Sequence, residues 1–567
     1  MHRRNAFLLV MMLAACGGHA ATATTSEGEP RADAAAGAPS EGDAALTDDA
    51  LSPSSDPSDG SAPNGSVAES CAAFLGLSSD GGGSAASEWV SVEDGGSLAY
   101  KSLPKGDHIL DFSYAGYMGG GVAFPTLPAS VTLKPSGGDD TAAIQAAIGK
   151  VSALPLNSGA RGVVLLGPGT FQLQGSLSIA SSGVVLRGSG SGAAGTTLNV
   201  TGSARTVLTI GGMGERATTG AAATVTDAYV PSGSVTVHVN DASGLTVGTS
   251  VLVGRPVTTA WIAFMGMNDL VRNDAGQTWL KAGTVIETER TVAAVSGNAI
   301  TFDVPLSDSL DATYVSPPGA TVTPYTFAGR IEQVGLESLR IVAPPASTPL
   351  NEPTFEMLAM DAVADSWVKD VAAQGFINGM TLGSGALRVT VEGVSFVHTA
   401  PIDGDAGYPA DFAIDGQLVL LDRCASQGDH VFSVVTEDVD PGPNVVLHMT
   451  ATGTPTNLAP HQRWATGLLV DGLDSPTGGV DLMNRTTAGS GQGWAIGFGV
   501  VWNANAANLL IEQPPGSQNW AIGSAGTVSA TSTGAIDSPG TAVGPASLYL
   551  AQLCERLGPQ AVTNLGY

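Results

Sequence analysis

Short apolar segments recur along the C-terminal part of the chain, and this repetition most constrains how the chain can fold. Many begin about 20 to 30 residues after the previous one. Examples are Leu339–Val342, Trp367–Val371, Leu387–Val391, Leu418–Leu421, Val445–His448, Leu468–Val470 and Leu509–Ile511. One such strand cannot bury its apolar face alone, whereas coils stacked on one another create a continuous core. The pattern therefore predicts a stack of β-coils over residues 331–567.

A helix, a strand and a tight turn precede these repeats. Asp140 is placed to cap the helix, because its carboxylate can accept from free N–H groups of the first turn. Ile144 and Ile148 follow at helical spacing, and a Gly-Pro-Gly turn interrupts residues 162–171. The run over residues 131–200 resembles the start of the pectate-lyase-like family of right-handed parallel β-helices. The resemblance implies an all-β solenoid with an N-terminal capping helix and an activity on polysaccharides.

Residues 210–330 break the coil pattern. Gly297-Asn298 is a hairpin-type turn between two β-type segments. The expected strands lie in Ser234–Val239, Ser250–Val253, Thr291–Val295 and Ala299–Val304. We predict a small antiparallel β insertion here. Its Trp261, Met265, Met267 and Trp279 are more typical of a core than of a binding surface.

A C-terminal helix is predicted to cover the last coil. Residues 546–557 have an amphipathic pattern. Pro545 suits the first turn of such a helix, and Gly558 suits its end.

The first residues predict export and a lipid anchor. A basic start and a short apolar run over residues 6–13 precede Leu-Ala-Ala-Cys, which ends at Cys16. The run is too short to span a bilayer, so residues 1–15 are predicted to be a cleaved signal peptide. The ending resembles the bacterial lipoprotein box. It implies a lipidated Cys16 that anchors the protein in the outer membrane, facing the periplasm or the cell surface.

The next segment has the composition of a tether. Residues 16–88 are rich in Ala, Gly, Ser, Thr, Pro and acidic residues and hold few large apolar side chains. Such a segment cannot offset the entropy cost of folding, so we expect it to be disordered. Residues 89–209 are then predicted to hold a leader, the capping helix and the first coils.

Net charge limits the classes of partner that the chain can bind, and cysteine content limits the disulfides that it can form. The net charge of −28 argues against nucleic acid, because binding phosphate requires clustered cations. We expect a monomer. Of the four cysteines, at most one pair forms a disulfide if Cys16 is lipidated. We predict a Cys71–Cys554 bridge and a buried Cys424 thiol.

Two polar stretches, residues 460–467 and 484–494, concentrate the candidate site residues. In a strand His461 and Arg463 would share a face, since side chains alternate. Arg485 follows Arg463 after about one coil, so the two guanidinium groups are predicted to stack and to grip a carboxylate or sulfate. The candidate contacts with substrate are Trp464, Asn484, Trp494 and Gln417.

Both stretches resemble runs in a pectate-lyase-like subgroup. Similar resemblance covers Asp415–Gln417, Asp429–His430 and Gln518–Gly523, within roughly residues 330–567. The resemblance supports action on a polysaccharide but assigns no catalytic role to any residue.

Two cleavage chemistries fit these residues. In β-elimination from a uronate, His461 or His430 would be the base, and Arg463 and Arg485 would stabilise the developing negative charge. In glycoside hydrolysis, two carboxylates do the work. Their candidates are Asp415, Asp429 and Asp471. We prefer elimination by a small margin.

Other interpretations remain open. Asp403, Asp405, Asp411 and Asp415 are close in sequence and would suit Ca²⁺, which takes oxygen ligands. In a purely structural interpretation, Arg463 forms an ion pair with Asp471 or Asp481. The tryptophans Trp464, Trp494 and Trp520 are then packing residues at the edge of the solenoid. A non-catalytic carbohydrate-binding or adhesive surface protein would use the same polar loops.

Overall fold

The computed structural model describes residues 71, 74, 85–93, 97–345, 352–402, 407–454 and 456–567. The predicted signal peptide, Cys16, most of the predicted tether, and Asp403 and Asp405 lie outside these residues. Within the described part, no helix is long and apolar enough to cross a membrane.

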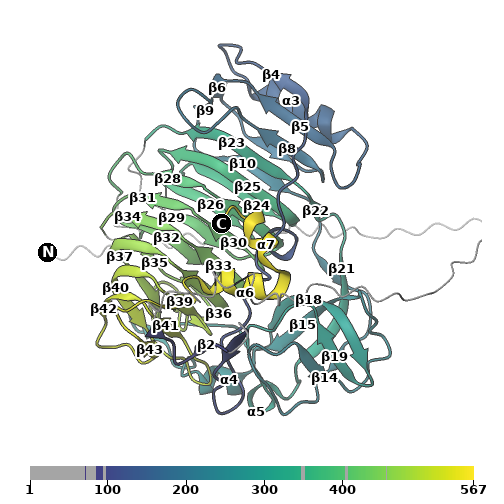
Figure 1. Ribbon diagram of the computed structural model, residues 1–567, viewed down its shortest axis with the longest axis vertical. Coiled ribbons are helices and arrows are strands. Elements are labelled where there is room, and N and C mark those ends of the chain that lie inside the picture. The colour runs from purple at the N-terminus through teal and green to yellow at the C-terminus, as the bar shows by residue number, and fades with distance from the viewer. Residues whose placement is uncertain are drawn as a thin grey trace, which may run out of the picture. The chain divides into compact units, whose positions relative to one another are not determined.

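The chain from residue 129 onward winds into an all-β, right-handed parallel β-helix whose strands form one 29-stranded sheet. Each coil contributes strands to three faces, here called A, B and C in chain order, and equivalent strands of successive coils pair in parallel (Figure 1). The fold class predicted from the sequence is confirmed.

The strands of each face follow one another up the stack. Face A contains β4 (Ala129–Leu133), β5 (Gly162–Leu166), β8 (Val184–Arg187), β22 (Ile331–Glu332), the first parts of β23 (Gly335–Val342) and β25 (Val363–Gln374), β27 (Ala386–Glu392), β30 (Leu420–Asp422), β33 (Pro441–Leu447), β36 (Ala465–Asp471), β38 (Ile496–Gly497), β39 (Val500–Trp502), β41 (Trp520–Ile522) and β43 (Ala535–Asp537). Face B contains β6 (Gly169–Leu173), β9 (Thr196–Val200), the last parts of β23 and β25, β28 (Ser395–Val397), β31 (Ala425–Gln427), β34 (Thr450–Thr452), the starts of β37 (Asp474–Leu482) and β40 (Asn505–Ile511), and β42 (Ala525–Val528). Face C contains β7 (Leu177–Ile179), β10 (Thr206–Gly211), β24 (Glu356–Asp361), β26 (Asn378–Leu382), β29 (Ala410–Ile414), β32 (Val431–Thr436), β35 (Thr456–Leu458) and the ends of β37 and β40.

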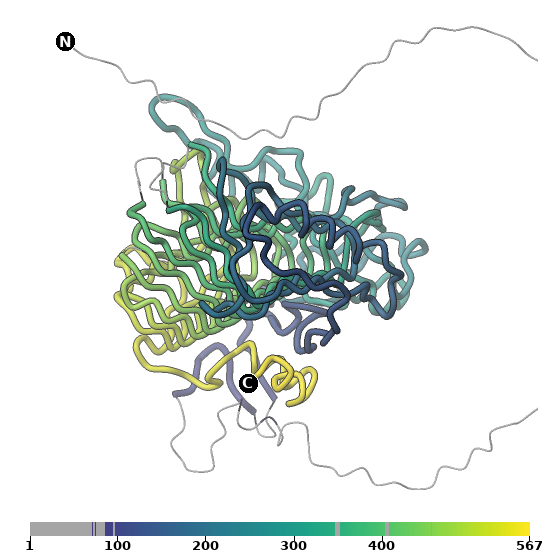
Figure 2. The backbone as a smooth tube through the Cα atoms, turned by 90° about the horizontal axis from the view of Figure 1, so that it is seen from above, coloured from purple at the N-terminus to yellow at the C-terminus, as the bar shows by residue number. Residues whose placement is uncertain are grey.

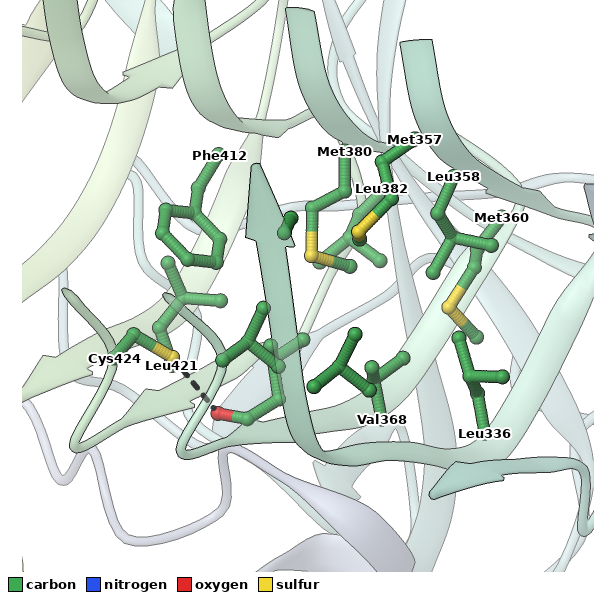
Figure 3. Close-up of a cluster of buried hydrophobic side chains, with 14 of the residues drawn as sticks. Leu336, Met357, Leu358, Met360, Val368, Met380, Leu382, Phe412, Leu421 and Cys424 are labelled. Carbon is green, nitrogen blue, oxygen red and sulfur yellow. Dashed lines mark hydrogen bonds between the residues drawn. The ribbon is translucent and has the colours of Figure 1, made fainter. Parts of the chain in front are cut away.

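The interior of the solenoid is filled by the inward side chains of all three faces. Met380 and Phe412 come from neighbouring coils of face C, and Val368 and Leu421 come from face A (Figure 3). Burying each such side chain contributes about 1.5–3 kcal/mol. Cys424 lies among them as a free buried thiol, as predicted, and burial raises its pKa to about 12.

Helix α3 (Thr141–Ser152) packs against the first coil (Figure 1), and Ile144 and Ile148 are among its buried residues. The predicted capping role of Asp140 is wrong. Its two carboxylate oxygens accept from Ser136 N at 2.9 Å and from Gln172 N at 3.0 Å, which ties the start of the helix to β6. Asp139 takes the expected role, because its Oδ1 accepts from Thr141 N at 3.1 Å.

The insertion leaves the solenoid after β10 on face C and returns at β22 on face A. Its main sheet is antiparallel and seven-stranded, with a hairpin at Gly297-Asn298 as predicted. The elements are β11 (Arg216–Thr218), β12 (Ala223–Thr224), β13 (Tyr229–Val230), β14 (Thr236–His238), β15 (Ser250–Pro256), α4 (Thr259–Phe264), β16 (Val271–Arg272), β17 (Ala275–Gly276), β18 (Val285–Ser296), β19 (Ala299–Phe302), β20 (Leu310–Asp311), α5 (Ala312–Val315) and β21 (Thr321–Phe327). The insertion's aromatic and methionine cluster is buried, as expected of a core.

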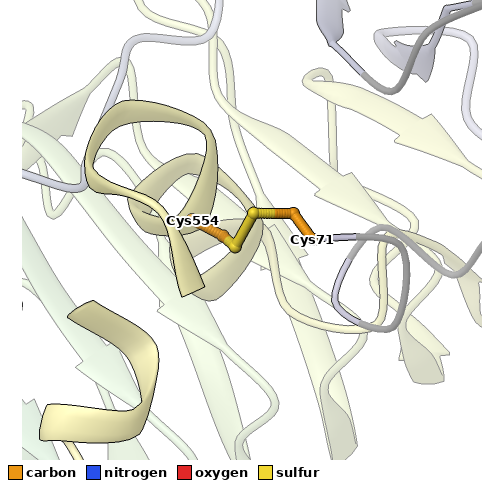
Figure 4. The surroundings of a disulfide bond; sticks show 2 residues. All are labelled: Cys71 and Cys554. Carbon is orange, nitrogen blue, oxygen red and sulfur yellow. A yellow bond between two sulfur atoms is a disulfide. The ribbon is translucent and has the colours of Figure 1, made fainter. Parts of the chain in front are cut away.

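The leader and the C-terminal helices lie together on one side of the solenoid (Figure 2). Their apolar side chains and the outward side chains of face A form a second core. The elements there are β1 (Ala85–Ala86), β2 (Val90–Val92), β3 (Leu98–Tyr100), the 3-10 turn η1 (Tyr117–Gly119), β44 (Val543–Gly544), α6 (Leu548–Leu557) and α7 (Pro559–Asn564). The predicted Cys71–Cys554 disulfide is present and joins the leader to α6 (Figure 4).

Helix α6 begins two residues later than the sequence pattern indicates. Ser547 is its N-cap, and its side chain accepts from Leu550 N, so Pro545 lies outside the first turn. The buried Asp471 carboxylate accepts from Ser547 Oγ at 2.7 Å and from Tyr549 N at 2.8 Å. Asp471 therefore anchors the helix onto face A.

Candidate functional site

Polar side chains line up at the corner where face C ends and face A begins, here called the C–A corner. Asp415 follows β29, Glu437 follows β32, and His461 and Arg485 follow on the next two coils. Because Ile414 pairs with Thr436, Asp415 and Glu437 occupy equivalent places one strand spacing apart, about 4.8 Å. The solenoid thus converts residues more than twenty positions apart in the sequence into neighbours.

Asp415 is a half-buried carboxyl among other carboxylates. Burial, together with the nearby negative charges of Asp438 and Glu437, raises its pKa to about 8. Removing a carboxylate from water disfavours its charged form, and like charges disfavour it further. Asp415 is therefore protonated and can donate a proton at neutral pH.

A directional chain of hydrogen bonds reaches Glu437 from Arg485. Arg485 Nε donates to Gln492 Oε1 at 2.6 Å, so the amide nitrogen of Gln492 must face His461. That nitrogen lies 2.8 Å from His461 Nε2 and can only donate, so Nε2 is the unprotonated ring nitrogen. His461 therefore carries its proton on Nδ1 and donates it to Glu437 Oε1 at 3.1 Å.

This chain keeps Glu437 ionised. Burial by itself would raise the pKa of Glu437, but the hydrogen bonds from His461 and Gln462 hold that pKa below its ordinary value. The second oxygen, Oε2, accepts from Gln462 Nε2 at 3.1 Å. The side chain nevertheless remains 38% exposed, so the carboxylate is accessible to a ligand.

The insertion flanks this corner because it leaves the solenoid there. Arg272 and Gln277 both donate to Gly489 O at 3.0 Å, which holds the loop over residues 484–494. That loop carries Gln492, whose side chain is buried. The insertion thereby fixes the residue that connects Arg485 to His461.

The structure brings three of the predicted catalytic residues together and separates the others from them. Asp415, His461 and Arg485 lie at the C–A corner. His461 and Arg463 do not share a strand face, because residues 459–464 lie between β35 and β36 and are not in a strand. Arg463 donates to Ser490 Oγ and does not stack on Arg485, which instead lies over Phe432 at 5.9 Å. His430 stands at the opposite end of β32 from Glu437.

Most of the predicted substrate contacts are engaged within the protein. Trp464 is 2% exposed, packs on Trp261 and donates from Nε1 to Asp308. Gln417 is buried, accepting from Glu289 N and donating to Glu287 O of the insertion.

The other two contacts show the same pattern. Trp494 donates to Met265 O. The Asn484 side chain accepts from Thr486 N, so both side chains hold loops in place.

The predicted calcium cluster does not converge among the described residues. Asp411 lies at the start of β29 and Asp415 follows its end. Asp411 is fully buried, with Oδ1 2.8 Å from His398 Nε2 and Oδ2 accepting from Ser426 Oγ. Of the residues that the structure places, no group of three or more His, Cys, Asp or Glu is arranged to hold a metal ion.

Sequence reasoning missed Glu437, Gln492 and Phe432. Glu437 stands one coil after Asp415, so the strand spacing alone was a signal that could have found it. Gln492 carries no such signal, because its place depends on how the 484–494 loop folds back onto His461.

Comparison with known proteins reveals similarity only among solved structures. No family model matches the chain, and no curated protein matches it. The tailspike protein gp49 of Pseudomonas phage LKA1 is 14% identical, with a TM-score of 0.34 over 70% of each chain. A mutant tailspike of E. coli bacteriophage HK620, in complex with a pentasaccharide, is 11% identical, with a TM-score of 0.37 over 71% of this chain and 57% of that chain. The gp54 tailspike of Acinetobacter baumannii bacteriophage AP22, in complex with capsular saccharide, is 10% identical, with a TM-score of 0.28 over 70% and 71%.

Proposed function

We propose that this protein is a carbohydrate-active enzyme that hydrolyses a glycosidic bond, with Asp415 as the acid and Glu437 as the base or nucleophile. The proposal is carried by the equivalent places of Asp415 and Glu437 on adjacent coils, together with surroundings that shift their pKa values in opposite directions. Glycosidases use such a pair, and environments that separate two carboxyl pKa values assign the acid and the base.

The surroundings of each carboxyl group favour the protonation state that its proposed role requires. Asp415 holds a proton at neutral pH because its pKa is raised to about 8, so it can protonate the leaving oxygen. Glu437 stays ionised because His461 and Gln462 donate to its two oxygens. It can then activate water or attack the sugar. His461 and Gln492 act as positioning residues, since they orient Glu437 through hydrogen bonds.

The neighbouring surface suits a sugar. The half-buried ring of Phe432 lies 6.3 Å from the His461 ring and beneath the Arg485 guanidinium. Aromatic faces pack against the apolar faces of sugars, and guanidinium groups donate to their oxygens.

Eliminative cleavage, which we favoured slightly from the sequence, is the second candidate. The Arg485 guanidinium supports it, because its positive charge acts on Glu437 and would also favour a uronate carboxylate bound at this corner. His461 fits less well as the base, because its unprotonated nitrogen, Nε2, already accepts a hydrogen bond from Gln492. A lyase at this site would need Gln492 to turn away first.

A glycan panel incubated with the full-length protein separates these possibilities. New reducing ends without ultraviolet absorbance from unsaturated uronates indicate hydrolysis, and both signals together indicate elimination. We expect hydrolysis, and we expect Asp415→Asn to slow it by about 10²- to 10⁴-fold. Asp474→Asn is the matched control, because Asp474 is exposed and lies on face B. Binding without turnover across the panel would favour the non-catalytic interpretation.

The lipid anchor at Cys16 is a separate proposal about location, and Cys16 lies outside the described residues. It rests on the Leu-Ala-Ala-Cys sequence and the short apolar run before it. We expect Cys16→Ser to move the protein from the membrane fraction to the soluble fraction. An unchanged distribution would contradict lipidation.

A further inference from the structure

A second surface feature lies at the other end of the same strands. A hollow of about 620 Å³ opens where β28, β31 and β34 of face B lead into β29, β32 and β35 of face C. Its lining includes His398, Pro401, Asp429, His430 and Gly453. The acid–base pair does not include any residue of this hollow.

An aromatic row connects the hollow with the acid–base pair. Tyr408 stacks on His430, with ring centroids 5.2 Å apart and an interplanar angle of 21°. The Tyr408 ring lies 5.8 Å from Phe432, which lies 6.3 Å from His461. Strand β32 has six residues, so its two ends are about 20 Å apart. One extended saccharide chain can therefore reach both places.

The charged groups that line the hollow indicate whether it accepts charged or uncharged sugars. Among the described residues, its lining holds the exposed Asp429 and no Lys or Arg. His398 is buried and paired with Asp411, so its charge is already matched. Arg485 lies over Phe432, which is one ring further along the row than Tyr408. A uronate or sulfate in the hollow would meet a carboxylate without a counter-cation.

We propose that the hollow is a saccharide-binding subsite that accepts uncharged sugar residues of a chain extending to Asp415 and Glu437. The proposal rests on the proposed function for the identity of the chain. The His430 ring lines the hollow and supplies a face for stacking, and Tyr408 packs on that ring and holds it in place. Asp429 accepts from Thr454 N through Oδ1, and none of the residues that the structure describes donates to its Oδ2, which can accept from a sugar hydroxyl.

Binding to an array of neutral and uronate-containing glycans tests the subsite. The full-length Glu437→Gln variant is used as the parent so that bound glycans persist. We expect neutral glycans to bind, and His430→Ala or Tyr408→Ala to weaken each hit by about tenfold. His238→Ala is the matched control, since His238 is exposed in the insertion. Asp429→Lys should admit uronate-containing glycans at the same positions.

The outcomes separate this subsite from the proposed function. Unchanged affinity in both His430→Ala and Tyr408→Ala, equal binding of uronate and neutral glycans by the parent, or an array without any hit would overturn the subsite. If His430→Ala weakens binding while Asp415→Asn leaves turnover unchanged, the subsite stands and the acid–base pair is wrong.

Discussion

The interior of the solenoid and its C–A corner are built by the same coils but obey different rules. In the interior, any apolar side chain of suitable size continues the stack, as Met380 and Phe412 do on neighbouring coils. At the corner, each coil contributes a different polar group, and the groups interact in a fixed order from Arg485 to Glu437. The repeated apolar positions therefore stabilise the fold, whereas the polar positions that differ from coil to coil form the candidate site.

The largest expected effect comes from the corner. Glu437→Gln removes the ionised carboxylate but keeps its shape, so we expect glycan turnover to fall by about 10²- to 10⁴-fold. Thermal unfolding should change little, because the side chain is partly exposed. Turnover close to that of the unsubstituted protein would refute the role of Glu437.

A substitution in the core should instead lower the stability of the fold. Phe412→Ala leaves a cavity between coils, so we expect a loss of about 3–5 kcal/mol in the free energy of unfolding. Denaturant titration measures this loss. Asp474→Asn serves as the surface control and should lie within about 0.5 kcal/mol of the parent. Equal losses in both variants would break the distinction between interior and surface.

The leader depends on its covalent link to α6. Cys71→Ser removes the disulfide, and we expect a loss of about 2–5 kcal/mol. Reduction of the parent should reproduce this loss, whereas Cys71→Ser should be insensitive to reductant. Reduction that leaves the parent's stability unchanged would be evidence against a structural role for the bridge.

Stability should also depend on pH through Asp471. Burial raises the pKa of Asp471 to about 7, above its value of about 3.9 in an unfolded chain. The folded state then binds the extra proton, so stability falls as pH rises between these values. Asp471→Asn should flatten this part of a plot of melting temperature against pH. An identical slope in parent and variant would contradict the assignment.

The smallest expected effect concerns the order of the hydrogen bonds at the corner. In Gln492→Glu, the new carboxylate can accept from both Arg485 Nε and His461 Nε2, so His461 should carry protons on both ring nitrogens at neutral pH. Nitrogen NMR of labelled imidazoles detects this change, with Gln560→Glu as the control, since Gln560 is exposed in α7 and outside the hydrogen-bond chain. A His461 that keeps a single proton in Gln492→Glu would disprove the direction of the chain.

The sequence was more informative about the interior than about the corner. Strand spacing, the Gly297-Asn298 hairpin and the Cys71–Cys554 pair were predicted because each depends on local or compositional signals. Trp464 and Gln417 were predicted as sugar contacts, but the insertion covers both. Their burial follows from where the insertion leaves the solenoid, and no local pattern reveals that place.

The candidate site was predictable only in part for a related reason. His461 and Arg485 were identified in two polar stretches and Asp415 as a candidate carboxylate, but which of them meet depends on coil register. Glu437 became visible only once Ile414 and Thr436 were paired. The assignment of the acid and the base remains a prediction that experiments on turnover must test.

The protonation state of Asp415 tests the central claim most directly, and it requires no substrate. Infrared difference spectra between the parent and Asp415→Asn report a protonated carboxyl group through its C=O stretch. We predict such a band at neutral pH, disappearing as the pH rises through about 8, because burial and the neighbouring carboxylates raise the pKa of Asp415. A spectrum in which Asp415 is already ionised at pH values near 5 would contradict the account, since that is close to its ordinary behaviour in water.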